Sequence, residues 1–229
     1  DAIKVGRTHN IDYLRQGKTP PMMLHLKYKF YEKTIYALLK KTIGIENGNF
    51  FPTAGAAVPD EICEFVHSVG INMIVGYGLT ESTATVSCFP DKGYEIGSVG
   101  TLMPDVEVKI GENNEILLRG KTITTGYYRK PEATADAIDK DGWFHTGDLA
   151  RVDEEGYYYM TGRKKNLIIL DSGENVSPEE LEGMLEKCPA VQECIVKELG
   201  KKIGVVVYCP QDKQQTVQEH ITEMNRTLP

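Results

Sequence analysis

The chain has 229 residues, of which 41% are hydrophobic and 26% are charged, so wholesale disorder is excluded and a folded core is expected. The formal net charge of −7 makes a general nucleic-acid-binding protein a poor interpretation. This charge is unevenly distributed, because residues 1–50 hold nine Lys and Arg residues against four Asp and Glu residues.

The first part of the chain predicts two helices and a buried strand. Apolar residues recur at helical spacing over 24–43, with lysines between them, which indicates an amphipathic helix. A second helix is expected over 59–69, where Pro59 suits the first helical position. The short apolar run at 71–75 then predicts a strand. A helix followed by a buried strand is typical of a parallel α/β layer, which we expect to extend to about residue 96.

The remainder of the chain has a different texture, in which short strand-like runs alternate with turn residues. These runs predict an antiparallel β subdomain over about 97–161 and, after Gly162, a small α+β domain. The small domain has a capping-box pattern at Ser177. We therefore expect an α/β and α+β chain with a large domain over 1–161 and a small domain over 162–229. The expected strands and helices are 106–110, 115–119, 149–152, 157–161, 165–170, 178–187, 191–198, 203–209 and 212–225.

The five cysteines form no C-x-x-C pair, and none lies near a histidine at metal-ligand spacing. This usage is typical of a reducing compartment, so a cytoplasmic location is expected. Generic nucleotide motifs also fail. Gly76-Tyr77-Gly78 lacks the third glycine of a dinucleotide fingerprint, and Gly120-Lys121-Thr122 lacks the upstream glycine of a Walker loop.

Four segments nevertheless hold residues suited to nucleotide chemistry. Residues 76–82 (GYGLTES) follow the buried strand, and a hydroxyl beside a carboxylate there could hold a phosphate oxygen and Mg²⁺. Residues 142–149 (GWFHTGDL) place a carboxylate between a glycine turn and a strand, where it could accept hydrogen bonds from a ribose. Residues 162–166 (GRKKN) and 172–180 (SGENVSPEE) are the others. Each has a purely structural alternative, namely a tight turn, a backbone cap, a solvated basic hairpin or a helix cap.

Together, in this order and spacing, the four segments resemble the adenylate-forming superfamily, which contains acyl-CoA synthetases, luciferases and peptide-synthetase adenylation domains. The linking segments 97–101 (GSVGT) and 124–134 (TTGYYRKPEAT) match as well. Residues 15–18 (RQGK), 51–57 (FPTAGAA) and 162–170 (GRKKNLIIL) are most similar to bacterial long-chain fatty-acid–CoA ligases.

The resemblance implies two half-reactions without a protein nucleophile. A fatty carboxylate attacks the α-phosphorus of ATP to give acyl-AMP and pyrophosphate, and the thiol of coenzyme A then attacks the acyl carbon and releases AMP. It further implies that Gly55-Ala56-Ala57 lie against the adenine and acyl group. Tyr77 would stack on the adenine beside Gly78, Thr80 would hold the α-phosphate, and Glu81 would hold Mg²⁺.

The remaining implied roles lie later in the chain. Asp148 and Arg163 would hold the ribose, and Lys165 would be the hinge about which the small domain rotates between half-reactions. Gly173 would approach the pantetheine arm of coenzyme A, although many relatives have a loop that is one residue shorter and an aspartate where this chain has Asn166.

Two features of the family are absent from the sequence, namely the phosphate loop ending in Pro-Lys and the catalytic lysine near the C-terminus. The 229 residues are therefore expected to be part of a larger protein and to have negligible ligase activity alone. The alternatives are an adenylating enzyme for another carboxylic acid or for a carrier protein, and a non-catalytic nucleotide- or CoA-binding module. The acyl chain length and oligomeric state stay open.

The basic helix at 24–43 has two interpretations. It is expected to be a solvated helix that lies on another part of the large domain. The second interpretation is a peripheral membrane contact at the inner face of the cell membrane, which suits a membrane-derived substrate.

Overall fold

The computed structural model describes residues 1–48, 50–83, 85–90, 93–170, 172–200 and 202–227. The chain forms two compact units, which are described separately. Unit 1 comprises residues 1–108, 118–144 and 152–159, and unit 2 comprises residues 109–117, 145–151 and 160–229. The boundary of the predicted domains at residue 161 stays a prediction. Across the described ranges, no helix is long and apolar enough to cross a membrane.

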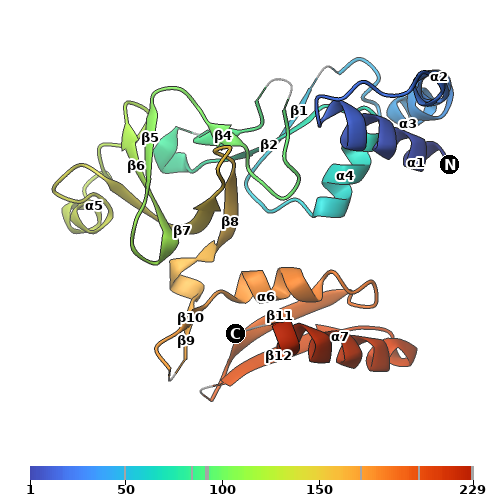
Figure 1. The fold of residues 1–229 in the computed structure, drawn as a ribbon. Helices are drawn as coiled ribbons and strands as arrows, with labels where there is room; N and C mark the ends of the chain where they lie inside the picture. The colour runs from blue at the N-terminus through green and yellow to red at the C-terminus, as the bar shows by residue number, and fades with distance from the viewer. Residues whose placement is uncertain (49, 84, 91–92, 171, 201, 228–229) are drawn as a thin grey trace. The chain divides into compact units, whose positions relative to one another are not determined.

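Unit 1 begins with helices that the sequence predicts only in part (Figure 1). Helix α1 (Ala2–Arg7) continues into a π-helical segment (Thr8–Leu14), and neither was expected. The predicted helix at 24–43 is present, but a π-helical turn (Glu32–Tyr36) separates α2 (Met22–Tyr31) from α3 (Ala37–Thr42).

The π-helical turn accompanies a change in which residues of this helix are buried. Tyr28 and Tyr36 are buried with Val69 and Ile71, whereas Leu38, expected on the apolar face, is 67% exposed. A residue added to one helical turn shifts the face that follows, so the simple 3.6-residue pattern fails there.

A parallel strand pair forms the centre of unit 1. Strand β1 (Phe51–Thr53) pairs in parallel with β2 (Met73–Tyr77), in the register Phe51 to Met73. Helix α4 (Asp60–Ser68) connects them, with Pro59 at its N-cap position. The parallel α/β layer is thereby confirmed. Two short strands complete a sheet with the order β1-β2-β3-β4: β3 (Ser87–Cys88) and β4 (Thr101–Leu102), both joined by antiparallel pairing.

A second four-stranded sheet has the order β5-β6-β7-β8 and accounts for the predicted β subdomain. Its strands are β5 (Val106–Ile110), β6 (Glu115–Gly120), β7 (Phe144–Val152) and β8 (Tyr158–Arg163), and α5 (Pro131–Ala137) lies between β6 and β7 in the sequence. Strand β7 begins five residues before the predicted strand at 149–152, so Asp148 lies within a strand and not in the turn before it.

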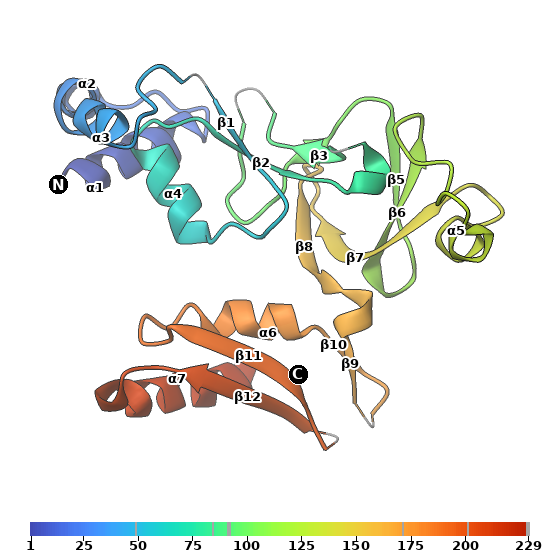
Figure 2. The same cartoon turned by 180° about the vertical axis from the view of Figure 1, so that it is seen from behind.

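The C-terminal part of unit 2 is built on a two-stranded hairpin of β11 (Glu193–Leu199) and β12 (Lys202–Tyr208). Helices α6 (Pro178–Leu185) and α7 (Gln214–Thr227) lie beside this hairpin (Figures 1 and 2). Their common core contains Ile168, Leu181, Leu185, Val196 and Met224.

Two predictions for this region are wrong. The strand expected over 165–170 is a 3₁₀ turn (Lys164–Asn166) followed by the short strand β9 (Ile168–Ile169), which pairs with β10 (Asn175–Val176). The capping box at Ser177 does not form, because the Ser177 hydroxyl accepts no hydrogen bond from a backbone N–H of α6. It lies instead within hydrogen-bond distance of the Thr161 carbonyl and of Glu179 Oε2. Asp171, in the predicted turn, lies outside the described residues.

Candidate functional site

The residues expected at the adenine and the phosphates follow the two parallel strands. Gly55-Ala56-Ala57 come shortly after β1, and Tyr77 is the last residue of β2. Because Thr53 pairs with Val75 in parallel register, both loops leave the same edge of the sheet. The carboxyl ends of parallel strands are where α/β sheets bind ligands. The structure therefore brings these two predicted segments to one edge.

After β2 the chain passes through Gly78 and turns sharply into a 3₁₀ segment (Thr80–Ser82). The buried Ser82 hydroxyl holds this turn, since it accepts from the Leu79 N–H at 2.9 Å and donates to the Leu79 carbonyl at 3.0 Å. Thr80 is exposed, so its hydroxyl is accessible to a ligand. The same turn holds Glu81 next to Thr80.

A second segment of unit 1 holds Glu81 in place. The Tyr127 hydroxyl donates to Glu81 Oε1 at 2.8 Å, and the Thr124 N–H donates to the Glu81 carbonyl at 2.7 Å. The hydrogen bond to Glu81 raises the pKa of Tyr127, because ionised Tyr127 could not donate it. Sequence reasoning gave Tyr127 no role. The segment 124–134 was recognised only as a linking piece, and nothing in the spacing pairs residue 127 with residue 81.

The surroundings of Glu81 fit a magnesium ion that is shared with a nucleotide. No group of three or more His, Cys, Asp or Glu side chains within the described ranges could hold a metal ion. Mg²⁺ commonly binds through one or two carboxylates together with substrate phosphates and water. Glu81 beside the Thr80 hydroxyl could supply the single carboxylate of such a site.

The predicted ribose residues form an ion pair within unit 2. Asp148 lies on β7 and Arg163 ends β8, which is the neighbouring strand. Arg163 Nε lies 3.0 Å from Asp148 Oδ1. The Asp148 side chain is 6% exposed and that of Arg163 is 54% exposed, so the pair has one buried and one accessible member. A fixed carboxylate beside an exposed guanidinium can accept hydrogen bonds from ribose hydroxyls and donate to ribose or phosphate oxygens.

The last two predicted residues also lie in unit 2. Lys165 is exposed in the 3₁₀ turn that connects β8 to β9, which is a short connection of the kind that can absorb backbone rotation. Gly173 lies in the turn between β9 and β10, where its N–H donates to the Leu170 carbonyl at 2.8 Å. The residues from Gly55 to Glu81 belong to unit 1, and those from Asp148 to Gly173 belong to unit 2.

Comparison with known proteins gives consistent matches. The family described as AMP-binding enzyme matches residues 17–128. The long-chain-fatty-acid–CoA ligase FadD15 of Mycobacterium bovis is 34% identical over 77% of this chain and 29% of that protein. The chain thus spans less than a third of the length of this relative.

Solved structures agree with this match. ATP-bound MatB from Rhodopseudomonas palustris has a TM-score of 0.70 at 27% identity, over 83% of this chain and 41% of that one. The o-succinylbenzoate CoA synthetase MenE of Bacillus subtilis, solved with the acyl-adenylate intermediate OSB-AMP, has a TM-score of 0.70 at 25% identity, over 86% of this chain and 43% of that one. Residues 17–128 thus belong to the AMP-binding enzyme family, and similarity to a long-chain-fatty-acid–CoA ligase and to an o-succinylbenzoate CoA synthetase extends over most of the chain.

Proposed function

We propose that the natural protein containing this chain is an ATP-dependent long-chain fatty-acid–CoA ligase. The observation that carries the nucleotide part is the Asp148–Arg163 pair at 3.0 Å, in a chain that also presents Thr80 and Glu81 at the carboxyl end of β2. The long-chain part is supported by the similarity to the mycobacterial ligase. Similarity to the o-succinylbenzoate CoA synthetase supports the ligase class but favours no particular acid.

In this proposal, four residues of the chain have separate roles in binding the nucleotide or in the movement between half-reactions. Thr80 donates its hydroxyl hydrogen to an α-phosphate oxygen, which positions the α-phosphorus for attack by the carboxylate. Asp148 accepts hydrogen bonds from the ribose hydroxyls. Glu81 would hold Mg²⁺, which when bound neutralises charge on the phosphates. Lys165 lies in the turn that would let the C-terminal part of the chain move before the coenzyme A thiol attacks the acyl carbon.

The experiment that tests the function is a substrate panel with the whole natural protein. ATP-dependent thioester formation is measured with fatty acids of graded chain length, with aromatic acids, and with either coenzyme A or an acyl carrier protein as acceptor. We expect the highest kcat/KM for a long-chain fatty acid and coenzyme A. Preference for an aromatic acid or a carrier protein would contradict the long-chain assignment, and absence of adenylation with every acid would favour a binding module.

Tyr127→Phe should lower ligase activity through Glu81. Loss of a hydrogen bond to a charged group costs about 1.5–3 kcal/mol, so a decrease in kcat/KM of about 10- to 100-fold is expected. The Mg²⁺ concentration that gives half-maximal rate should rise, because the carboxylate is less well oriented. Tyr128→Phe is the matched control, since the neighbouring Tyr128 is 83% exposed. Equal rates and equal Mg²⁺ dependence for the two variants would contradict the role of Tyr127.

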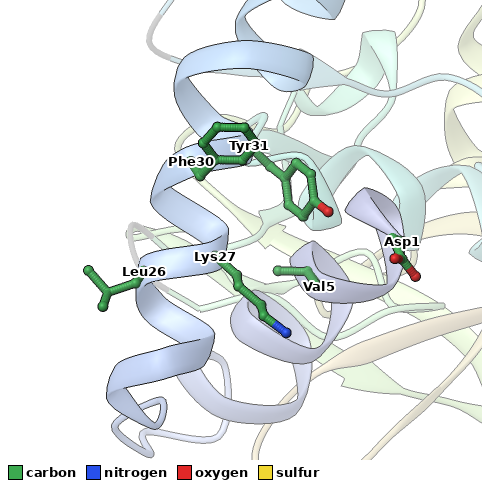
Figure 3. Close-up of a pocket in the computed structure, with 6 residues that line it drawn as sticks. All are labelled: Asp1, Val5, Leu26, Lys27, Phe30 and Tyr31. Carbon is green, nitrogen blue, oxygen red and sulfur yellow. The ribbon is translucent and has the colours of Figure 1, made fainter.

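We also propose that the lysine-rich helical region from Met22 to Thr42 contacts the anionic inner face of the cell membrane. The apolar side chains of Met22, Met23 and Phe30 are all more than half exposed there. A shallow pocket of about 370 Å³ lies between α1 and α2 on this region (Figure 3). Exposed apolar side chains interspersed with lysines are typical of helices that lie in a membrane interface. The pocket is lined by Asp1, Val5, Leu26, Lys27, Phe30 and Tyr31.

Binding to vesicles tests this contact. Charge reversal of Lys27, Lys33 and Lys41 should abolish binding to anionic vesicles, whereas reversal of the exposed Lys187, Lys197 and Lys213 should not. Lys40 is left unchanged because its ammonium donates to the Gly70 carbonyl at 2.7 Å. Wild-type protein that does not bind anionic vesicles, as expected if another part of the protein covers the helix, would contradict the proposal.

A further inference from the structure

Glu115, at the start of β6, is a buried carboxylate that has no role in the proposed mechanism. Glu115 is 4% exposed, and its two oxygens accept hydrogen bonds from different segments of unit 2. The Gly147 N–H donates to Oε1 at 3.0 Å, and Lys164 Nζ donates to Oε2 at 2.8 Å. His145 Nδ1 lies 3.4 Å from Oε2.

The charge of Glu115 is stabilised where it lies. Burial alone would raise the pKa of this carboxyl, but the hydrogen bonds from Lys164, His145 and Gly147 outweigh burial and lower the pKa below its usual value. Glu115 is therefore ionised at neutral pH. A buried carboxylate that loses a charged partner is costly, so the contacts of Glu115 constrain the segments that supply them.

Those segments are the ones that carry the ribose pair. Gly147 immediately precedes Asp148 on β7, and Lys164 immediately follows Arg163 at the end of β8. Thr146 makes a second connection between β6 and Asp148. Its hydroxyl donates to the Ile116 carbonyl at 2.8 Å and accepts from the Asp148 N–H at 3.0 Å. One carboxylate thus connects the residue before Asp148 to the residue after Arg163.

We propose that Glu115 is a positioning residue for the Asp148–Arg163 pair and thereby determines the affinity for the ribose hydroxyls. This inference rests on the proposed function, in which that pair binds ribose. In metal sites, mutation of a group that orients a ligating side chain typically changes affinity by about 10- to 100-fold. We expect a similar dependence for a carboxylate and a guanidinium that must be held in position to bind a ribose.

The test is nucleotide binding by the whole natural protein without fatty acid, measured by isothermal titration calorimetry. Glu115→Gln preserves the shape of the side chain and an acceptor for Gly147, but removes the charge that faces Lys164. We expect it to raise the dissociation constant of ATP about tenfold. The dissociation constant of 2′,3′-dideoxy-ATP should be unchanged, because this probe lacks the hydroxyls that the pair would bind.

Two further variants keep the test interpretable. Lys164→Met removes the other partner of the Lys164–Glu115 contact. Because the Lys164 side chain is 49% exposed, this variant should fold even if the Glu115 variant does not. It should raise the ATP dissociation constant to a similar extent. Glu107→Gln is the matched control, since Glu107 pairs with Arg119 at the surface and both side chains are about half exposed. This control variant should leave the dissociation constants of ATP and of 2′,3′-dideoxy-ATP unchanged.

The outcomes separate this proposal from the proposed function. An equal loss of affinity for ATP and for dideoxy-ATP in Glu115→Gln would overturn positioning and indicate a general structural role. Weaker ATP binding in Asp148→Ala without any change in Glu115→Gln and Lys164→Met would overturn positioning alone. Unchanged ATP binding in Asp148→Ala would overturn the ribose role and the positioning role together.

Discussion

Asp148→Ala is expected to weaken ATP binding by the whole natural protein by about 10- to 100-fold. The Asp148 carboxylate is 6% exposed, so solvent screens it little. Hydrogen bonds that involve a charged group contribute about 1.5–3 kcal/mol, and 1.4 kcal/mol corresponds to a tenfold change in affinity. Removal of the carboxylate also leaves the Arg163 guanidinium without the partner that lies 3.0 Å away.

Calorimetric titration with ATP measures this effect, and Asp212→Ala is a suitable control. Asp212 is an exposed carboxylate in the turn before α7, so its removal should leave ATP affinity within experimental error of the wild type. An ATP dissociation constant in Asp148→Ala that equals the wild-type value, in a variant whose circular dichroism is also unchanged, would contradict the assignment of Asp148 to the ribose.

Gly100→Ala is expected to have the largest effect on stability. Gly100 has φ +83°, and a Cβ atom there would lie 1.9 Å from the Cys88 carbonyl carbon and 2.0 Å from its oxygen. Backbone atoms cannot move aside as a flexible side chain can, so β3 and β4 would have to separate. The Gly100 carbonyl also accepts from the Tyr158 N–H at 3.0 Å, and this bond would be strained as well. We expect a loss of about 3 kcal/mol in the free energy of unfolding, or failure to fold.

Gly156→Ala is the matched control for Gly100→Ala. Gly156 has almost the same backbone angle, φ +85°, but nothing lies within 4 Å of a Cβ added there. Alanine at Gly156 should therefore cost only the left-handed backbone penalty of about 1 kcal/mol. Denaturant midpoints of the two variants measure the difference. Equal midpoints would show that the collision with Cys88 is relieved by small movements of the sheet.

Sequence patterns correctly predicted several strands whose apolar residues follow one another, or alternate, along the chain. The apolar run before Tyr77 and the alternating runs around the turn at 111–114 predicted strands close to β2, β5 and β6. These predictions succeed because the spacing of apolar residues indicates which side chains of a strand are buried. The π-helical turn at Glu32–Tyr36 was not predictable, since it depends on packing against Val69 and Ile71, which are distant in the sequence. The strand expected over 165–170 is likewise shortened to β9, and the 3₁₀ turn that precedes it holds Lys164, whose ammonium donates to the distant Glu115.

The candidate site shows the same division. The expectation that Asp148 and Arg163 lie together came from a resemblance, and the structure places them in contact. Tyr127 and Glu115 were given no role, because their importance comes from partners 46 and 49 residues away along the chain. A tyrosine in a turn and a glutamate at the start of a strand have no distinguishing local pattern. Only the tertiary structure identifies Glu81 and Lys164 as their partners.

The division of the chain into two units has a consequence for the order in which the protein folds. Neither unit is a continuous stretch: residues 109–117 and 145–151 belong with residues 160–229, and residues 118–144 and 152–159 belong with residues 1–108. During synthesis, unit 1 cannot be completed until residue 159 has left the ribosome. By then residues 109–117 and 145–151 of unit 2 have been synthesised, but residues 160–229, with which they pack, have not. Domains normally fold as units during synthesis, and contacts between distant residues slow folding. Each of the four strands β5 to β8 contains residues of both units, so we expect this sheet to be completed late in folding.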